Sequence, residues 1–249
     1  MIPLPEEFVS AKICRALTQS SCSCARLGIG MGVMRFLGAA LLLYLTASAE
    51  VIRFVNGVPG ELPGGWTVAM THDGAPPRWE IVRDESAPSP PYVFAQVSRD
   101  TTAGRFPLAI WDAVVIRDGG VSVAFKTVDG AVDQAAGIVW RYQDPNNYYI
   151  VRANALENNV VLYKVENGVR LSIAPKGLPS RSYGVKHQIP HRHWSTLKIA
   201  FKDSYFTVFL NEERLFETED RTFTKAGKTG LWTKADSVTY FDEFTVTGK

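Results

Sequence analysis

Positively charged and amide side chains fall on neighbouring strands that the sequence predicts near its middle. Arg152 and Asn154 share one face of the strand expected over 147–156, because side chains alternate along a strand. Arg141 lies on the preceding strand and Lys164 on the following one. Such groups, when they converge on one sheet face, bind sugar hydroxyls or carboxylates, and arginine can donate two parallel hydrogen bonds.

Aromatic residues expected within reach of these strands have the shape to stack on the apolar face of a sugar ring. They are Tyr148, Tyr163 and Trp232. We expect Tyr148 or Trp232 to stack on the ligand, and alanine at Arg152 to weaken binding without lowering stability. The alternative is that the rings belong to the core and the charged residues lie on a solvated exterior.

The carboxylates show no pattern that identifies catalytic residues. A retaining glycosidase needs two carboxyl groups about 5–5.5 Å apart. Glu217-Thr218-Glu219 places two of them on one strand face, but a solvated strand end explains this pair better. Glu80 and Asp84-Glu85 are scattered. The catalytic residues of any hydrolase activity are therefore unknown from the sequence.

Three histidines gather before Trp194. His191 and His193 have the His-x-His spacing that some zinc sites use, and His187 is close in sequence. No acidic residue or cysteine lies nearby, and Pro190 indicates a loop, so a surface loop is favoured over a metal site.

Short alternating runs and turn signals dominate the chain after residue 50. Leu197, Ile199 and Phe201 alternate with polar residues, as one apolar face of a strand requires. Asn167-Gly168 between two apolar runs predicts a hairpin, because both residues tolerate the positive φ of a type I′ turn. About a dozen such strands without helical periodicity predict an all-β jelly-roll sandwich of two antiparallel sheets over residues 50–249.

The first 49 of the 249 residues have a different character. Met34-Arg35, the apolar run 36–45 and the small residues before Glu50 predict a signal peptide cleaved between Ala49 and Glu50. The apolar run is too short to cross a bilayer, which needs about 20 residues. The alternative is an uncleaved membrane anchor that extends back through residues 27–33, but Arg35 would then lie within the membrane. Residues 1–30 are then explained by a start codon chosen too early. The predicted location is extracytoplasmic, either periplasmic or secreted, with no membrane association after cleavage.

Removal of this leader would change the composition. All three cysteines lie within it, so the mature chain would have no disulfide or thiol chemistry. The remainder has 23 basic and 23 acidic residues. A net charge near zero does not indicate a nucleic-acid partner or an anionic membrane surface.

Three segments resemble the concanavalin A-like lectin/glucanase domains, which are also called laminin-G-like. Residues 137–149 match the pattern G-x-x-x-R-x-x-D-x-x-N-Y-Y, residues 194–212 match a strand–turn–strand unit with a leading Trp, and residues 230–246 match the closing strands. Exported bacterial domains labelled family-16 glycoside hydrolase-like or 3-keto-disaccharide hydrolase-like are the group most similar to this pattern. The resemblance covers nearly all of residues 50–249. It implies the fold well and the activity poorly.

The resemblance also bears on ligands and activity. The Glu-x-Asp-x-x-Glu strand of family-16 enzymes is absent. Related sandwiches hold a structural calcium, for which Asp242 is the candidate ligand here, although no cofactor is required. We expect a glycan-binding domain whose partner is a glycan or oligosaccharide. The alternatives are a hydrolase of a glycoside or 3-keto-disaccharide, and a laminin-G-like module that binds a protein partner.

Overall fold

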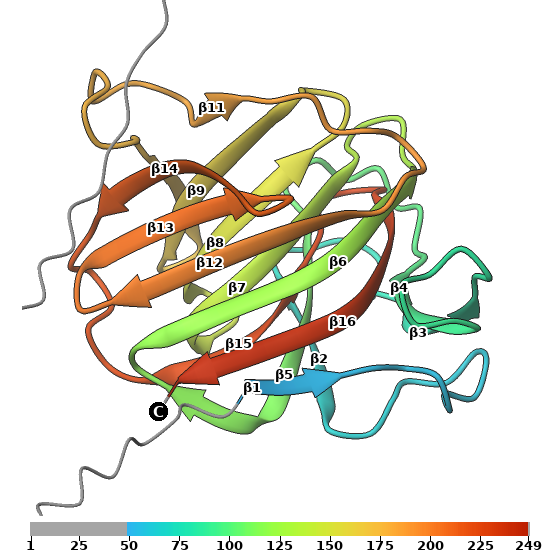
Figure 1. Ribbon diagram of the computed structural model, residues 1–249. Helices are drawn as coiled ribbons and strands as arrows, with labels where there is room; N and C mark the ends of the chain where they lie inside the picture. Colours follow the sequence, from blue (N-terminus) through green and yellow to red (C-terminus); the bar gives the residue numbers. More distant parts are fainter. Residues whose placement is uncertain (1–48, 249) are drawn as a thin grey trace, which may run out of the picture. The chain divides into compact units, whose positions relative to one another are not determined.

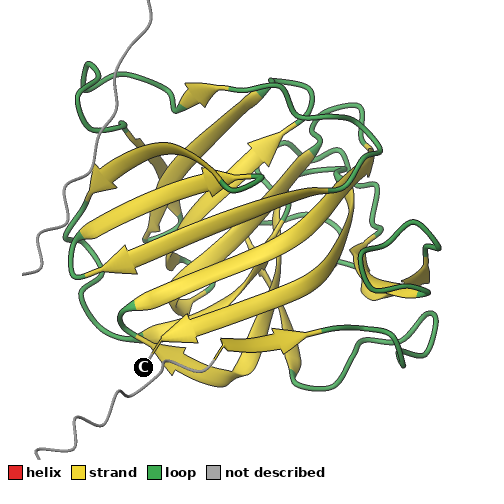
Figure 2. Cartoon of the chain, viewed as in Figure 1, coloured by secondary structure: helices red, strands yellow, loops and turns green. Residues whose placement is uncertain are grey.

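A computed structural model describes residues 49–248, which form sixteen β-strands and no helix (Figures 1 and 2). The predicted leader lies outside the described residues except for Ala49, the first residue of β1. No helix long and apolar enough to cross a membrane occurs among the described residues. The predicted all-β sandwich of two antiparallel sheets is confirmed.

Each sheet has eight strands. Sheet A contains, in spatial order, β14 (Glu213–Glu219), β13 (Tyr205–Leu210), β12 (Ser195–Lys202), β6 (Gly119–Asp129), β16 (Val238–Gly248), β4 (Tyr92–Gln96) and β3 (Trp79–Arg83), with β1 (Ala49–Ile52) beside β16. Sheet B contains β10 (Val169–Ile173), β9 (Asn159–Glu166), β8 (Asn147–Asn154), β7 (Ala135–Asp144), β15 (Gly227–Trp232), β5 (Phe106–Ile116) and β2 (Trp66–Thr71), with β11 (Val185–Lys186) beside β9.

The main core lies between the sheets. Leu197, Ile199 and Phe201 of β12 are buried there, as the alternation predicts, together with Trp140 and Tyr149 of sheet B. The predicted hairpin is also present: Asn167 and Gly168 have φ values of 50° and 80°, and β9 pairs with β10 on either side of them.

A second apolar cluster covers the face of sheet B that points away from sheet A, called here the outer face of sheet B. Phe106, Tyr148, Tyr163 and Trp232 are buried in it. This burial requires the sheet to curl, because strands five places apart in a flat sheet are separated by about 24 Å. The Arg170 Cζ of β10 lies only 4.8 Å from the Phe106 ring centroid of β5.

Polar contacts hold two diagonal corners of sheet B together. The Thr71 hydroxyl at the end of β2 donates to the Pro145 carbonyl oxygen, 2.5 Å away in the β7–β8 turn. The same hydroxyl is 2.7 Å from the Tyr148 hydroxyl. Gly168 in the next hairpin donates its N–H to the Asn146 carbonyl. The outer face of sheet B is therefore concave and largely filled by its own side chains.

Candidate functional site

Arg152 and Asn154 both lie on the outer face of sheet B. They alternate along β8 and are opposite Gly137 and Ala135 of β7. Both are almost completely buried. Arg152 and Asn154 therefore share one face, as predicted, but that face is not open to solvent where they lie.

Lys164 lies on the opposite face from Arg152. In the β8–β9 pairing Val161 is opposite Arg152, and Lys164 is three residues further along β9, so its side chain points toward sheet A. Its ammonium group contacts Thr222 Oγ1 at 2.7 Å and Asp220 Oδ2 at 3.3 Å. The prediction that Lys164 joins Arg152 in one site is wrong.

Arg141 also leaves the predicted site, because a β-bulge interrupts the alternation of β7. The register shifts after Trp140, and Arg141 adopts a φ of 49°. Its guanidinium turns toward sheet A and lies over the rings of Phe201 and Phe206. Uninterrupted alternation would have placed Arg141 on the face of Arg152.

Hydrogen bonds to backbone oxygens hold Arg141 in this position. Its guanidinium donates to the carbonyl oxygens of Phe223 at 2.8 Å, Asp203 at 2.6 Å and Arg117 at 3.1 Å. Burial lowers the pKa of Arg141. This side chain connects loops at the edge of the sandwich and is not available to a ligand.

The two rings predicted to stack on a sugar have no exposed surface. Tyr148 and Trp232 are each 0% exposed, and both belong to the cluster on the outer face of sheet B. Burial raises the pKa of Tyr148. Stacking on either ring is ruled out in this conformation, because the curl of sheet B encloses both.

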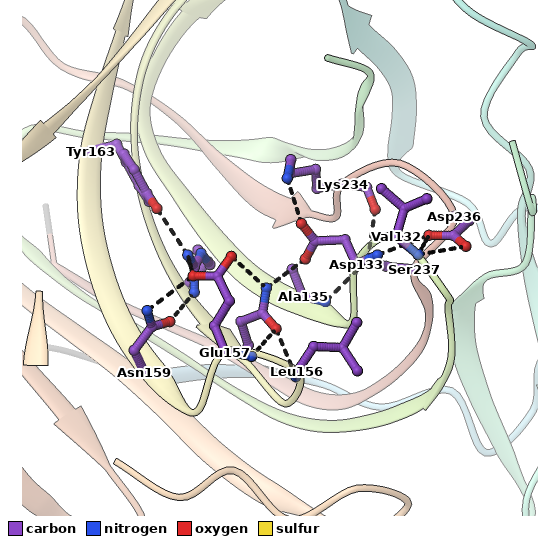
Figure 3. A network of polar contacts seen from close by, with 12 residues as sticks. Val132, Asp133, Ala135, Leu156, Glu157, Asn159, Tyr163, Lys234, Asp236 and Ser237 are labelled. Atoms are coloured by element: carbon purple, nitrogen blue, oxygen red, sulfur yellow. Dashed lines mark hydrogen bonds and ion pairs between the residues drawn. The ribbon is translucent and has the colours of Figure 1, made fainter. Parts of the chain in front are cut away.

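Four residues gather around Arg152 where β8 turns into β9, and together with it they form what we call the Arg152 cluster: Arg152, Glu157, Asn159, Tyr163 and Tyr183. The guanidinium donates to Glu157 Oε2 at 2.7 Å, to Asn159 Oδ1, and to the Tyr163 hydroxyl at 3.0 Å (Figure 3). It also donates to the Tyr183 hydroxyl at 3.1 Å. One Arg152 nitrogen, Nη2, serves three of these four acceptors.

A second set of polar contacts adjoins the cluster. The Asn154 amide donates to Asp133 Oδ1 at 2.6 Å and to Glu157 Oε1 at 3.4 Å (Figure 3). Asn154 Oδ1 accepts the backbone N–H groups of Leu156 and Glu157, so Asn154 also shapes the β8–β9 turn. Lys234 contacts Asp133 Oδ2 at 2.6 Å.

The cluster reaches solvent through two of its members. The Glu157 side chain is 37% exposed and Tyr183 is 48% exposed, whereas Arg152 is 2% exposed. The Glu157 carboxylate and the Tyr183 ring therefore lie between the buried Arg152 guanidinium and the solvent. Sequence reasoning missed both exposed groups: Glu157 lies in a turn, and Tyr183 lies in the long loop before β11.

Glu157 is held in its ionised form. Burial acts to raise its pKa, but the charge of Arg152 and the hydrogen bonds from Asn159 and Arg152 outweigh burial and lower it below the ordinary value of 4.5. A depressed carboxyl pKa contributes stability that is fully present above the unfolded-state pKa and is lost as the pH falls through the folded-state pKa.

We expect Glu157→Gln to remove this part of the pH dependence. The wild-type Tm should exceed that of the variant at neutral pH, and the gap should narrow as the pH falls below 4.5. Thermal unfolding of both proteins across that range measures the gap. A gap that stays constant down to about pH 3 would contradict the assigned ion pair.

The other predicted groups show no catalytic or metal-binding arrangement. Within residues 49–248, no three His, Cys, Asp or Glu side chains are placed to hold a metal ion. His191 contacts Gln134, and His193 contacts the His191 carbonyl. Glu217 and Glu219 pair with Arg214 and Arg221 on exposed strand ends, which agrees with the solvated interpretation.

Asp242, the candidate calcium ligand, is completely buried. Its two oxygens accept backbone N–H groups from Ser89 at 2.7 Å and Glu243 at 2.8 Å. Burial raises the pKa of Asp242 despite these bonds. Its carboxylate therefore already has donors that connect the 84–91 loop to β16.

The sequence matches no protein-family model and no curated protein. Among solved structures, the chain is similar to the carbohydrate-binding module CBM66 from Bacillus subtilis, with 20% identity, a TM-score of 0.56, and coverage of 74% of this chain and 96% of that one. A weaker similarity, with a TM-score of 0.46, relates it to domain 4 of AbnA, a GH43 extracellular arabinanase from Geobacillus stearothermophilus solved with arabinotriose. That pair is 13% identical and covers 74% of this chain and 82% of the other.

These identities are low, so what the chain shares with CBM66 is the β-sandwich fold. A Bacillus subtilis protein with a galectin-like fold gives a TM-score of 0.46 at 12% identity, over 73% of this chain and 88% of that one. The narrower resemblance to family-16 or 3-keto-disaccharide hydrolase-like domains stays a prediction.

Proposed function

We propose that this protein binds carbohydrate at the Arg152 cluster. The observation that carries the proposal is the convergence of the Glu157 carboxylate, the Tyr163 and Tyr183 hydroxyls and the Asn159 amide on one buried guanidinium. Such a group of charged and polar atoms, fixed by hydrogen bonds and reached beside an exposed aromatic ring, suits the hydroxyls of a sugar and its apolar face. The fold shared with CBM66 supports the proposal.

The physical reason for a ligand lies in the shared donor. Nη2 of Arg152 carries two hydrogens but is within 3.1 Å of three acceptors, so the three acceptors share its hydrogens, and the Tyr163 and Tyr183 hydroxyls also contact each other. A sugar hydroxyl beside Glu157 and Tyr183 can donate to one oxygen and accept from another. The exposed edge of the cluster therefore has unused acceptor capacity where a ligand would enter.

Tyr183→Ala is expected to lower glycan affinity by about tenfold, because the exposed ring supplies the stacking surface. Stability should change little, since about half of the ring is already in solvent. A glycan array with the full chain identifies the ligand, and calorimetric titration then gives the affinity of each variant. Tyr205→Ala is the matched control, because Tyr205 is 54% exposed on the other sheet. Equal affinities for the wild type and both variants would place the site elsewhere.

Glycoside hydrolysis is the second candidate, and one observation favours it. Asp133 Oδ1 and Glu157 Oε1 contact the same Asn154 nitrogen at 2.6 and 3.4 Å, so these two oxygen atoms cannot be further apart than the sum of those two distances. Retaining glycosidases have carboxyl groups about 5–5.5 Å apart. Glu157, whose lowered pKa keeps it ionised, would be the nucleophile.

Cleavage of the bound glycan distinguishes the two functions. Intact sugars after long incubation would support binding alone, while release of a reducing end that Glu157→Gln abolishes would support hydrolysis. No binding to any glycan would contradict both and favour the protein-binding alternative. Action outside the cytoplasm, predicted from residues 34–49, is part of the proposal.

A further inference from the structure

Arg170 lies beside the Arg152 cluster on edge strand β10. It is opposite Val165 of β9, two residues beyond Tyr163, and so points to the same outer face of sheet B as Tyr163. Its Cζ lies 4.6 Å from the Tyr163 ring centroid, and the Cζ of Arg152 lies 5.8 Å from that same centroid. Two guanidinium groups therefore share one aromatic ring.

Three rings surround the Arg170 guanidinium. Besides Tyr163, the ring centroids of Phe106 and Trp232 lie 4.8 and 5.8 Å from its Cζ. These cation–π contacts hold the guanidinium in place through the ring quadrupoles. They do not neutralise its charge, because none of the three rings is ionised at neutral pH.

Arg170 has no acidic partner. Within residues 49–248 it forms no ion pair and no side-chain hydrogen bond, and its Nη1 is buried without a partner. The nearby carboxylates are already engaged, Glu157 by Arg152 and Asp133 by Lys234. Among residues 49–248, Arg170 therefore has no counter-ion, whereas Arg152 and Lys234 each have one.

The accessible edge of Arg170 has the geometry for a planar anion. Nη1 is the only one of its three nitrogens that is buried without a partner, and the residue as a whole is half-buried. Nε and Nη2 form no hydrogen bond within residues 49–248 and are not fully buried, and this pair forms the side-on fork that binds both oxygens of a carboxylate.

We infer that the bound glycan is acidic and that Arg170 binds its carboxylate or sulfate group. This inference rests on the proposed function, because it assigns the ligand class of the same site. An uncompensated cation fixed by aromatic rings beside a sugar-binding cluster gains most from an anionic substituent. A neutral sugar would leave the charge of Arg170 without a counter-ion.

Calorimetric titration of the full chain with matched ligands tests the inference. The probes are trigalacturonate, its methyl ester, and galactan oligosaccharides with and without sulfate esters. We expect one acidic probe to bind about tenfold or more tightly than its uncharged counterpart. The uronate and sulfate arms identify which anion Arg170 takes.

The substitution Arg170→Gln should lower the affinity for the acidic probe to that of its uncharged counterpart. Arg170→Lys keeps a cation over the rings but removes the two parallel donors, so its affinity for the acidic probe should be intermediate. This variant still tests the inference if Arg170→Gln folds poorly. Lys198→Gln is the control, because it removes a cation 5.3 Å from the Phe209 ring on the other sheet. Thermal unfolding confirms that each variant is folded.

Four outcomes would overturn the inference. Equal affinity for acidic and uncharged probes would refute the inference that the ligand is acidic, but it would leave the proposed carbohydrate binding intact. An acidic preference that survives in Arg170→Gln and Arg170→Lys would assign it to another residue. Binding of neutral array glycans alone would refute the ligand class, and an array without any binding would refute the proposed function as well.

Discussion

Replacing Arg141 by methionine is expected to lower the free energy of unfolding by about 3–5 kcal/mol. The guanidinium is buried and donates to three backbone carbonyl oxygens that belong to separate loops. Methionine fills most of the volume but donates nothing, so those three oxygens would lose their donor and Asp118 would lose an ion-pair partner. Such a loss is a large share of the 5–15 kcal/mol that is typical of a folded domain.

Urea unfolding followed by tryptophan fluorescence measures this change. Arg117→Ala is the control, since its side chain is 56% exposed and pairs only with exposed acids. We expect that variant to lose less than about 1 kcal/mol, as is usual for surface ion pairs. A similarly small loss for Arg141→Met would show that water replaces the guanidinium and that the residue is not structural.

Arg152→Ala is expected to lower both glycan affinity and stability. The stability loss should be about 3 kcal/mol or more, because removal of a 2% exposed guanidinium leaves Asn159 Oδ1 without a donor and the Glu157 carboxylate without its ion-pair partner. The sequence alone predicts weaker binding with unchanged stability. That prediction assumes a solvated arginine, and the burial of Arg152 contradicts the assumption.

A double-mutant cycle with Glu157→Gln separates the ion pair from the rest of the cluster. The Arg152→Met, Glu157→Gln pair should lose less stability than the two single changes together, because neither charge is then left alone. Additive losses would contradict direct coupling at the 2.7 Å contact. Glycan affinity of the Glu157→Gln variant, measured in parallel, shows whether the carboxylate also contacts the ligand.

Local patterns determined much of the fold. The two-residue alternation places Leu197, Ile199 and Phe201 between the sheets, and Asn167-Gly168 forms the expected turn because both residues accept positive φ. These features depend on residues within a few positions of each other. The same alternation predicts that Arg152 and Asn154 share a face, which the structure confirms.

The membership of the site was decided only by the tertiary structure. The bulge at Arg141 and the register that sends Lys164 to the other face depend on pairing between strands, which alternation along one strand does not specify. The curl of sheet B buries Tyr148 and Trp232, and the loop before β11 brings Tyr183 to Arg152 from 31 residues away. A sequence shows which side chains have the chemistry to bind a sugar. Which of them are exposed to solvent, and which lie close together, is decided by packing between segments that are distant in the sequence.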